Sequence, residues 1–150
     1  MKGRVALLTV LFVFVACELC CRHSVMQKSH ASTASASIAW QPSKSVTGAF
    51  YRALVGDPDA PGRFEYQIKV PARARIAAHR HSVAMHVKVL SGSKVIVMGE
   101  PLALSRARHF AAGESLLIPA HSWHQEWWSD ETVEQIEGVG PMETEYKTKQ

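Results

Sequence analysis

Alternation of apolar and polar residues with a period of two is the clearest pattern along this chain. Residues 64–70 (FEYQIKV) show it best, with Phe64, Tyr66, Ile68 and Val70 on one parity. Successive side chains of a strand point to opposite faces, so this spacing predicts a strand with one buried face.

Further short apolar segments lie between turn-forming residues. They predict strands over 76–81, 86–90, 94–98, 115–118 and 132–139. Residues 94–98 (KVIVM) follow the turn at 91–93 and are predicted to be the hairpin partner of 86–90. Only residues 101–110 are expected to form a helix or a loop excursion. Many short strands joined by close turns predict an all-β sandwich or small barrel.

The first 21 residues have the organisation of a secretory signal sequence. A lysine and an arginine precede an apolar run of 12 residues, Val5 to Ala16, which one threonine interrupts. That run is too short to span a bilayer as a helix but matches the apolar core of a signal peptide. We therefore expect residues 1–21 to direct export to the periplasm or the extracellular space. Lipid anchoring at Cys17 and an uncleaved signal anchor are the two alternatives.

A serine- and alanine-rich segment (HASTASAS) lies within residues 22–44, which hold few large apolar groups, so a flexible linker is expected there. The folded domain is then 45–150. All three cysteines lie at positions 17, 20 and 21, so this domain has none. The domain therefore has neither a disulfide framework nor a thiolate zinc site.

The positive net charge of the chain comes from its N-terminal part. The formal charge is +4, but residues 45–150 contain 12 basic and 12 acidic residues. A sequence pI near 9.1 suggests nucleic-acid binding. A domain with balanced charge gives no basic face for it, so nucleic acid is not expected as a partner.

Three histidines carry the candidate chemistry. His79 and His81 are separated by one residue in a predicted strand, so both imidazoles point to the same face. His124 follows the loop after the strand at 115–118 and can supply a third imidazole on that face. Three neutral nitrogens suit divalent iron, zinc, manganese, nickel or copper, with coordination positions left for water or substrate. The identity of the metal stays open.

These residues resemble the two motifs of the cupin superfamily. His79, His81 and Gly92 match the first motif, and Gly113, Pro119 and His124 match the second. The chain looks like a small single-domain cupin of the ChrR-like type over roughly residues 45–143. The resemblance implies a double-stranded β-helix, the jelly-roll barrel, and a metal held by the three histidines. It also implies a homodimer formed through edge strands.

The chain departs from the motifs at several positions. The first-motif glutamate is replaced by Met85, whose thioether is a possible fourth ligand. The neighbouring His86 has the parity of the outer face, so it is a possible ligand only if a bulge re-aims it. The second motif has His121 in place of glycine, which histidine can tolerate because it is enriched at positive φ. Glu126 shares the parity of His124. It is either a fourth ligand, directly or through a bound water, or a solvated residue at the barrel mouth.

Parity also selects the residues expected to line the pocket. Val87 and Val89 share the parity of His81, and Trp128 that of His124, so all three are expected to line it. The resemblance implies a metal-dependent oxygenase or isomerase acting on a small organic molecule. A non-catalytic module that binds or senses a metal or small ligand is the alternative. Whether the protein is an enzyme stays open at this point.

Overall fold

The computed structural model describes residues 38–148. The predicted signal sequence and residues 22–37 of the predicted linker lie outside this range. Within it, the chain is all-β, as predicted, with a single short 3₁₀ turn at Leu104–Arg106. The strands are β1 Gln41–Pro42, β2 Phe50–Val55, β3 Gly62–Val70, β4 Arg75–His81, β5 Met85–Ser91, β6 Ser93–Met98, β7 Arg108–Ala111, β8 Ser115–Ile118, β9 His124–Trp127, β10 Thr132–Gly140 and β11 Thr144–Tyr146. No helix among these residues is long and apolar enough to cross a membrane.

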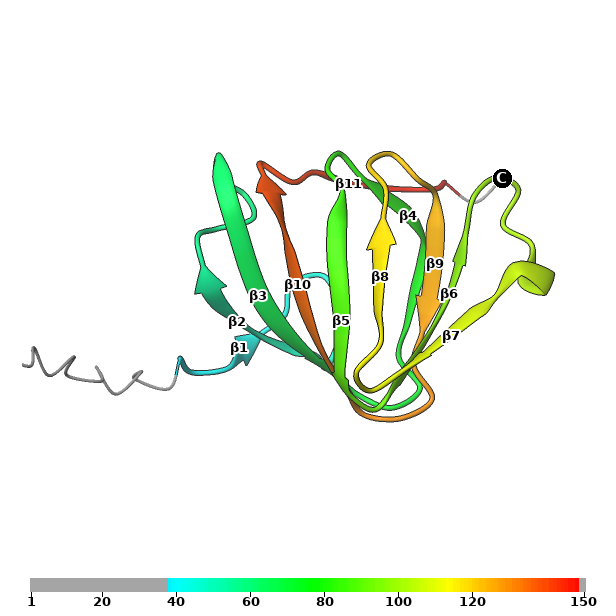
Figure 1. The fold of residues 1–150 in the computed structure, drawn as a ribbon, viewed down its shortest axis with the longest axis horizontal. Coiled ribbons are helices and arrows are strands. Elements are labelled where there is room, and N and C mark those ends of the chain that lie inside the picture. The colour runs from blue at the N-terminus through cyan, green and yellow to red at the C-terminus, as the bar shows by residue number, and fades with distance from the viewer. Residues whose placement is uncertain (1–37, 149–150) are drawn as a thin grey trace, which may run out of the picture. The chain divides into compact units, whose positions relative to one another are not determined.

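The strands form two antiparallel sheets. One has the order β1-β2-β3-β10-β5-β8 and the other β11-β4-β9-β6-β7. Figure 1 shows the strands converging at one end and spreading at the other, where β11 crosses the wide end. This is the jelly-roll barrel that the sequence predicted.

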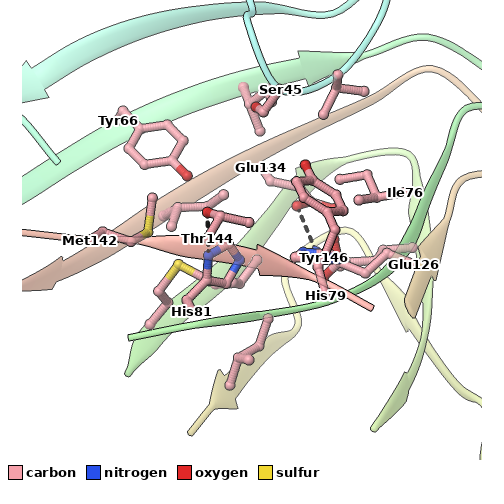
Figure 2. Close-up of a pocket in the computed structure, with 17 residues that line it drawn as sticks. Ser45, Tyr66, Ile76, His79, His81, Glu126, Glu134, Met142, Thr144 and Tyr146 are labelled. Atoms are coloured by element: carbon pink, nitrogen blue, oxygen red, sulfur yellow. Dashed lines mark hydrogen bonds and ion pairs between the residues drawn. The ribbon is translucent and has the colours of Figure 1, made fainter. Parts of the chain in front are cut away.

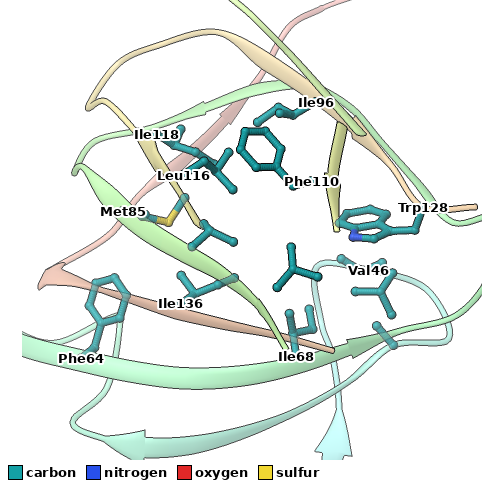
Figure 3. Close-up of a cluster of buried hydrophobic side chains, with 14 residues drawn as sticks. Val46, Phe64, Ile68, Met85, Ile96, Phe110, Leu116, Ile118, Trp128 and Ile136 are labelled. Carbon is teal, nitrogen blue, oxygen red and sulfur yellow. The ribbon is translucent and has the colours of Figure 1, made fainter. Parts of the chain in front are cut away.

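The core lies between the two sheets. Phe64, Ile68 and Val70 on β3 are buried, and Ile136 on the adjacent β10 joins them. Figure 3 shows this cluster continuing through Met85, Leu116, Ile118, Phe110, Ile96 and Trp128. The alternation in residues 64–70 therefore predicted the buried face of β3 correctly.

The predicted pairing of residues 94–98 with 86–90 is wrong. β6 pairs with β7 and β9, whereas β5 pairs with β10 and β8. Gly92, with φ at +76°, lies where the chain passes from one sheet to the other. A period of two identifies a strand and its faces but does not identify its neighbour.

The remaining differences lie at the edges of the barrel. The segment 101–110 holds the 3₁₀ turn and then the start of β7, an edge strand. β1, within the predicted linker, pairs with β2, and the sequence predicted neither strand. β11 was not predicted either, although it pairs with β4. β1 and β11 are short and lie at sheet edges, and β2 is the neighbour of β1 with no fully buried residue, so hydrophobic alternation is weak in all three.

Gly92 is expected to tolerate no side chain. A Cβ added there would lie 2.4 Å from the Glu131 carbonyl oxygen and 2.5 Å from Thr132 Oγ1. We expect Gly92→Ala to lower the free energy of unfolding by about 2–4 kcal/mol, from backbone strain together with this clash. Gly113→Ala is the matched control, because φ there is also positive but no atom lies within 4 Å. It is expected to cost only about 1 kcal/mol. Equal losses for both variants in urea unfolding would contradict this account.

Candidate metal centre

A bulge in β4 aims two histidines into the barrel. β4 pairs with β9 so that Ile76 lies opposite Glu126 and His79 opposite His124, with a register shift between the two pairs. The shift amounts to one extra residue on β4, which re-aims the side chains that follow. Ile76, His79 and His81 therefore all line one cavity, although Ile76 and His79 have opposite parity in the sequence.

The three predicted histidines converge. Each offers a ring nitrogen such that these atoms lie within 4.8 Å of one another. The ring centroids are 4.1 Å apart for His79 and His124, 4.9 Å for His79 and His81, and 5.3 Å for His81 and His124. His79 and His124 are buried, and His81 is partly exposed. This is the geometry of a three-histidine metal site.

Hydrogen bonds fix which nitrogen of each ring is available. Nδ1 of His79 lies 2.8 Å from the Ala77 carbonyl oxygen, and Nδ1 of His124 lies 2.8 Å from that of Ser122. Since a carbonyl only accepts, both Nδ1 atoms carry the proton and both Nε2 atoms keep a lone pair. Nδ1 of His81 lies 2.9 Å from the Thr144 hydroxyl, which can accept in the same way. In all three rings Nε2 is therefore the nitrogen available for binding, and three such nitrogens suit a divalent metal.

Burial keeps the site neutral without a metal. Burial, together with the neighbouring His79 and His124, lowers the pKa of His81 to about 4. Burial also lowers the pKa of His124, although Glu126 acts in the opposite direction. Both rings are therefore neutral at pH 7, which is the form that a metal requires.

Two cavities that share lining residues lie beside the histidines. The one that we call inner, about 100 Å³, is lined by His79 and His81 and by an apolar wall that includes Met85 and Val87. The outer one, about 340 Å³, shares Tyr66, Met142 and Thr144 with it. Figure 2 shows Tyr66, Met142 and Thr144 around the histidines, with His81 bonded to Thr144.

β11 supplies site residues that sequence reasoning missed. Thr144 and Tyr146 lie opposite His81 and His79 on β4. The Tyr146 ring lies 5.6 Å from that of His79, and both Thr144 and Tyr146 line the inner cavity. A three-residue strand carries too little alternation to be recognised, so no signal in the sequence pointed to these two residues.

Solved structures of similar fold were found at low sequence identity. A cupin 2 conserved barrel domain protein from Rhodopseudomonas palustris is 18% identical, with a TM-score of 0.61, over 75% of this chain and 79% of that chain. The polyketide cyclase RemF from Streptomyces resistomycificus is 16% identical, with a TM-score of 0.59, over 75% and 82%. Salicylate 1,2-dioxygenase from Pseudoaminobacter salicylatoxidans, in adducts with gentisate, is 14% identical, with a TM-score of 0.59, over 73% and 31%.

The domain has the cupin fold. Neither a protein-family sequence model nor a curated protein sequence matches the chain. The structural likeness therefore establishes the barrel, and the chemistry has to be inferred from the residues inside it.

Glu126 is not the solvated residue at the mouth of the cupin barrel that one interpretation expected. It is 5% exposed, and its Oε1 lies 2.9 Å from Lys94 Nζ. It lines the inner cavity but lies outside the cluster of converging ligand atoms. Burial raises its pKa, but Lys94, His124 and His79 outweigh that effect and lower it, so the carboxylate is ionised.

The other candidates divide between the cavity, the core and the surface. Met85 is buried and lines the inner cavity, as does Val87. The prediction that His86 could be a ligand is wrong, because His86 is exposed on the outer face of β5. The prediction that Val89 and Trp128 line the pocket is wrong as well. Both belong to the core beyond the cavity, and Trp128 Nε1 donates to Glu134.

The positive φ expected at His121 is confirmed, at 59°. The backbone N–H of His121 donates to the His81 carbonyl oxygen at 2.7 Å. The loop before β9 is thereby fastened to β4 next to the site.

The metal-free protein is expected to lose stability in mild acid. The folded-state pKa of His81, about 4, lies below its ordinary value of 6.5, so the unfolded chain binds more protons between these values. The free energy of unfolding should fall as the pH is lowered from about 6.5 toward 4 and should show no contribution from His81 above that range. Urea unfolding of chelator-treated protein across this range measures it. His81→Gln should flatten the dependence, whereas the exposed His86→Gln should keep it. Equal slopes for the wild type and His81→Gln would contradict the prediction.

Removal of the Thr144 hydroxyl is expected to weaken metal binding. Thr144→Val keeps the side-chain volume but leaves Nδ1 of His81 without its partner. We expect the affinity for Zn²⁺ to fall by about tenfold to a hundredfold, the usual effect of losing such an orienting group. Thr144→Ser retains a hydroxyl and is expected to keep most of the affinity. The prediction is wrong if competition titrations give Val and Ser variants of equal affinity.

Proposed function

We propose that this domain binds one divalent transition-metal ion through His79, His81 and His124 and uses it to hold a small organic molecule. The observation that carries the proposal is the orientation of the rings. All three Nδ1 atoms are engaged by fixed oxygens, which leaves the three Nε2 lone pairs free in one buried place. Fixing three rings in this way costs conformational entropy, and a histidine cluster without a ligand to bind would not need such fixed rings.

The donor set limits the metal to a few ions. Three neutral imidazoles suit iron, zinc, manganese, nickel or copper, whereas magnesium and calcium require oxygen ligands. A metal bound there would act as a Lewis acid toward an oxygen atom of a ligand. The chain's own part is to orient the rings, to exclude water with the apolar wall and to hold an ionised carboxylate below the site.

The cavities favour a ligand with two parts. The inner cavity, about 100 Å³, has room for only a few heavy atoms, whereas the outer one is about 340 Å³. Sites for small molecules generally have volumes of roughly 300–1,000 Å³. An oxygen-bearing end would lie at the histidines, and the body would occupy the outer cavity between Tyr66, Met142 and Tyr51.

The reaction class follows less directly. RemF and salicylate 1,2-dioxygenase, both of similar fold, are enzymes, which supports a metal-dependent oxygenase or isomerase. A non-catalytic module that binds a metal or a small ligand is the second candidate, and one observation favours it. Both buried carboxylates near the site are paired with Lys94, so among the described residues that line the inner cavity no carboxylate is free for proton transfer.

Export and self-association complete the proposal. The charged start and apolar run of residues 1–21 support a signal sequence, so the domain would work outside the cytoplasm. The edge strands β7, β8 and β11 offer places where a second copy could pair. Sequencing the N-terminus of the mature protein and measuring its mass in solution would test these two points.

Metal analysis of the purified protein tests the central claim. The wild type is expected to bind close to one equivalent of Zn²⁺, and His79→Gln, His81→Gln or His124→Gln should each reduce the affinity by about a hundredfold or more. His86→Gln is the matched control, because His86 lies on the neighbouring strand but is exposed on the outer face. Absence of stoichiometric binding in the wild type, or equal losses in the control, would refute the proposal.

A further inference from the structure

A buried lysine joins the two sheets below the histidines. Lys94, on β6, is 2% exposed, which is rare for lysine. Its Nζ lies 2.9 Å from Oε1 of Glu126 on β9 and 2.9 Å from Oε2 of Glu134 on β10. β6 and β9 belong to one sheet and β10 to the other. We call Lys94, Glu126 and Glu134 the charged triad.

The triad is held in one arrangement from both sides. Trp128 Nε1 donates to Oε1 of Glu134 at 2.6 Å, so the second oxygen of that carboxylate is also engaged. Nζ of Lys94 lies 5.3 Å from the centre of the Trp128 ring. The three groups therefore have little freedom to rearrange.

The triad does not balance its own charge. Burial lowers the pKa of Lys94, but the charges of Glu126 and Glu134 outweigh it and raise the pKa, so the lysine is positive. Burial raises the pKa of Glu134 and the charge of Glu126 raises it further, against the effect of Lys94, so a positive charge nearby favours its ionised form. When Glu134 is ionised, two carboxylates against one ammonium leave an excess of one negative charge. Burying charges in this way is costly, and a well-packed apolar cluster would generally serve stability as well or better. A neighbouring positive charge would stabilise this excess negative charge.

The histidine cluster is where that positive charge would lie. All three triad residues line the inner cavity together with His79 and His81, and Figure 2 shows Glu126 and Glu134 among the residues around it. Glu126 follows His124 by two residues on β9. Met85 stands at the place where the sequence motif has an anionic ligand, so the three-histidine set is itself neutral.

We propose that the charged triad is the anionic part of the metal centre, with Glu134 and Lys94 setting the charge that the bound ion experiences. This inference rests on the proposed metal site and deepens it. The triad acts through space and not as a ligand, because Glu126 lies outside the converging donor atoms and its Oε1 is bound to Lys94. The triad lines the same buried cavity as His79 and His81, where the effective dielectric constant is far below that of water, so one charge there acts strongly on a divalent ion at the histidines.

The inference predicts changes of opposite sign from two neighbours. Glu134→Gln removes a negative charge and should weaken Zn²⁺ binding by about tenfold or more, whereas Lys94→Met removes a positive charge and should strengthen it by a similar factor. The double variant Lys94→Met/Glu134→Gln again carries one net negative charge, on Glu126, and should bind nearly as the wild type does. Glu137→Gln is the control, because Glu137 lies on the same strand as Glu134 but pairs with Arg63 on the exposed face.

The experiment is a competition titration of the metal-free full-length protein with Zn²⁺ and a chromophoric chelator, at pH 7. Circular dichroism and thermal unfolding report whether each variant is folded. Lys94→Met leaves two buried carboxylates without the cation that they share and can fail to fold. Glu134→Gln and the double variant, each with fewer unpaired charges, then carry the test. The Co²⁺ absorption spectrum should be the same in Glu134→Gln and wild type, since the ligands do not change.

Two results would overturn the inference. One is an unchanged affinity in Glu134→Gln. The other is a loss of affinity in all three triad variants, which would indicate a merely structural role. If the wild type binds no Zn²⁺, the proposed function fails and this inference fails with it. If the wild type binds Zn²⁺ and His79→Gln does not, but Glu134→Gln has the same Zn²⁺ affinity as the wild type, only the role of the triad is refuted.

Discussion

The pairing of β4 with β9 is the constraint on which the site depends. It brings His79 opposite His124, although 44 residues separate them along the chain. The bulge between Ile76 and His79 decides which side of β4 faces inward at that level. With strict alternation from Ile76, Ala78 and Arg80 would enter the cavity in place of the two histidines. The carbonyl oxygen of Ala77, within the bulge, also accepts the Nδ1 proton of His79. One backbone irregularity thus aims the ring and fixes its tautomer.

The barrel interior combines two environments at different depths. Near the wide end lie the three histidines, and β11 covers them with Thr144 and Tyr146. Below them the triad ties β6 and β9 to β10 across the core. Apolar residues such as Met85, Ile118 and Ile136 line the same inner cavity and belong to the core. Low polarity strengthens electrostatic interactions, and this is the physical basis of the coupling that we propose between the histidine cluster and the triad.

Charge placement distinguishes this site from the motif that the sequence resembles. A first-motif glutamate would be a ligand, whereas here Met85 fills that place and the negative charge lies deeper, shared by Glu126 and Glu134 around Lys94. A ligand carboxylate occupies a coordination position, and a charge below the site does not. In the metal centre that we propose, this arrangement would keep more coordination positions available for a bound molecule and would still compensate the charge of the metal.

The sequence by itself determined the strand faces and the three histidines that converge. Alternation placed Phe64, Ile68 and Val70 in the core, and the spacing of His79 and His81, with motifs that continue to His124, predicted one shared face. These are local properties, because a strand's side chains alternate whatever lies beside it.

Tertiary structure decided the rest. The partner of residues 94–98, the contribution of Thr144 and the pairing of Lys94 with two distant carboxylates all depend on which strands become neighbours. The parity of Glu126 is the same whether it is solvated at the barrel mouth or buried in the triad. What decides between these two is that Lys94 on β6 and Glu134 on β10 lie beside it in the fold. Contacts of this kind join residues far apart in sequence, and no local pattern encodes them.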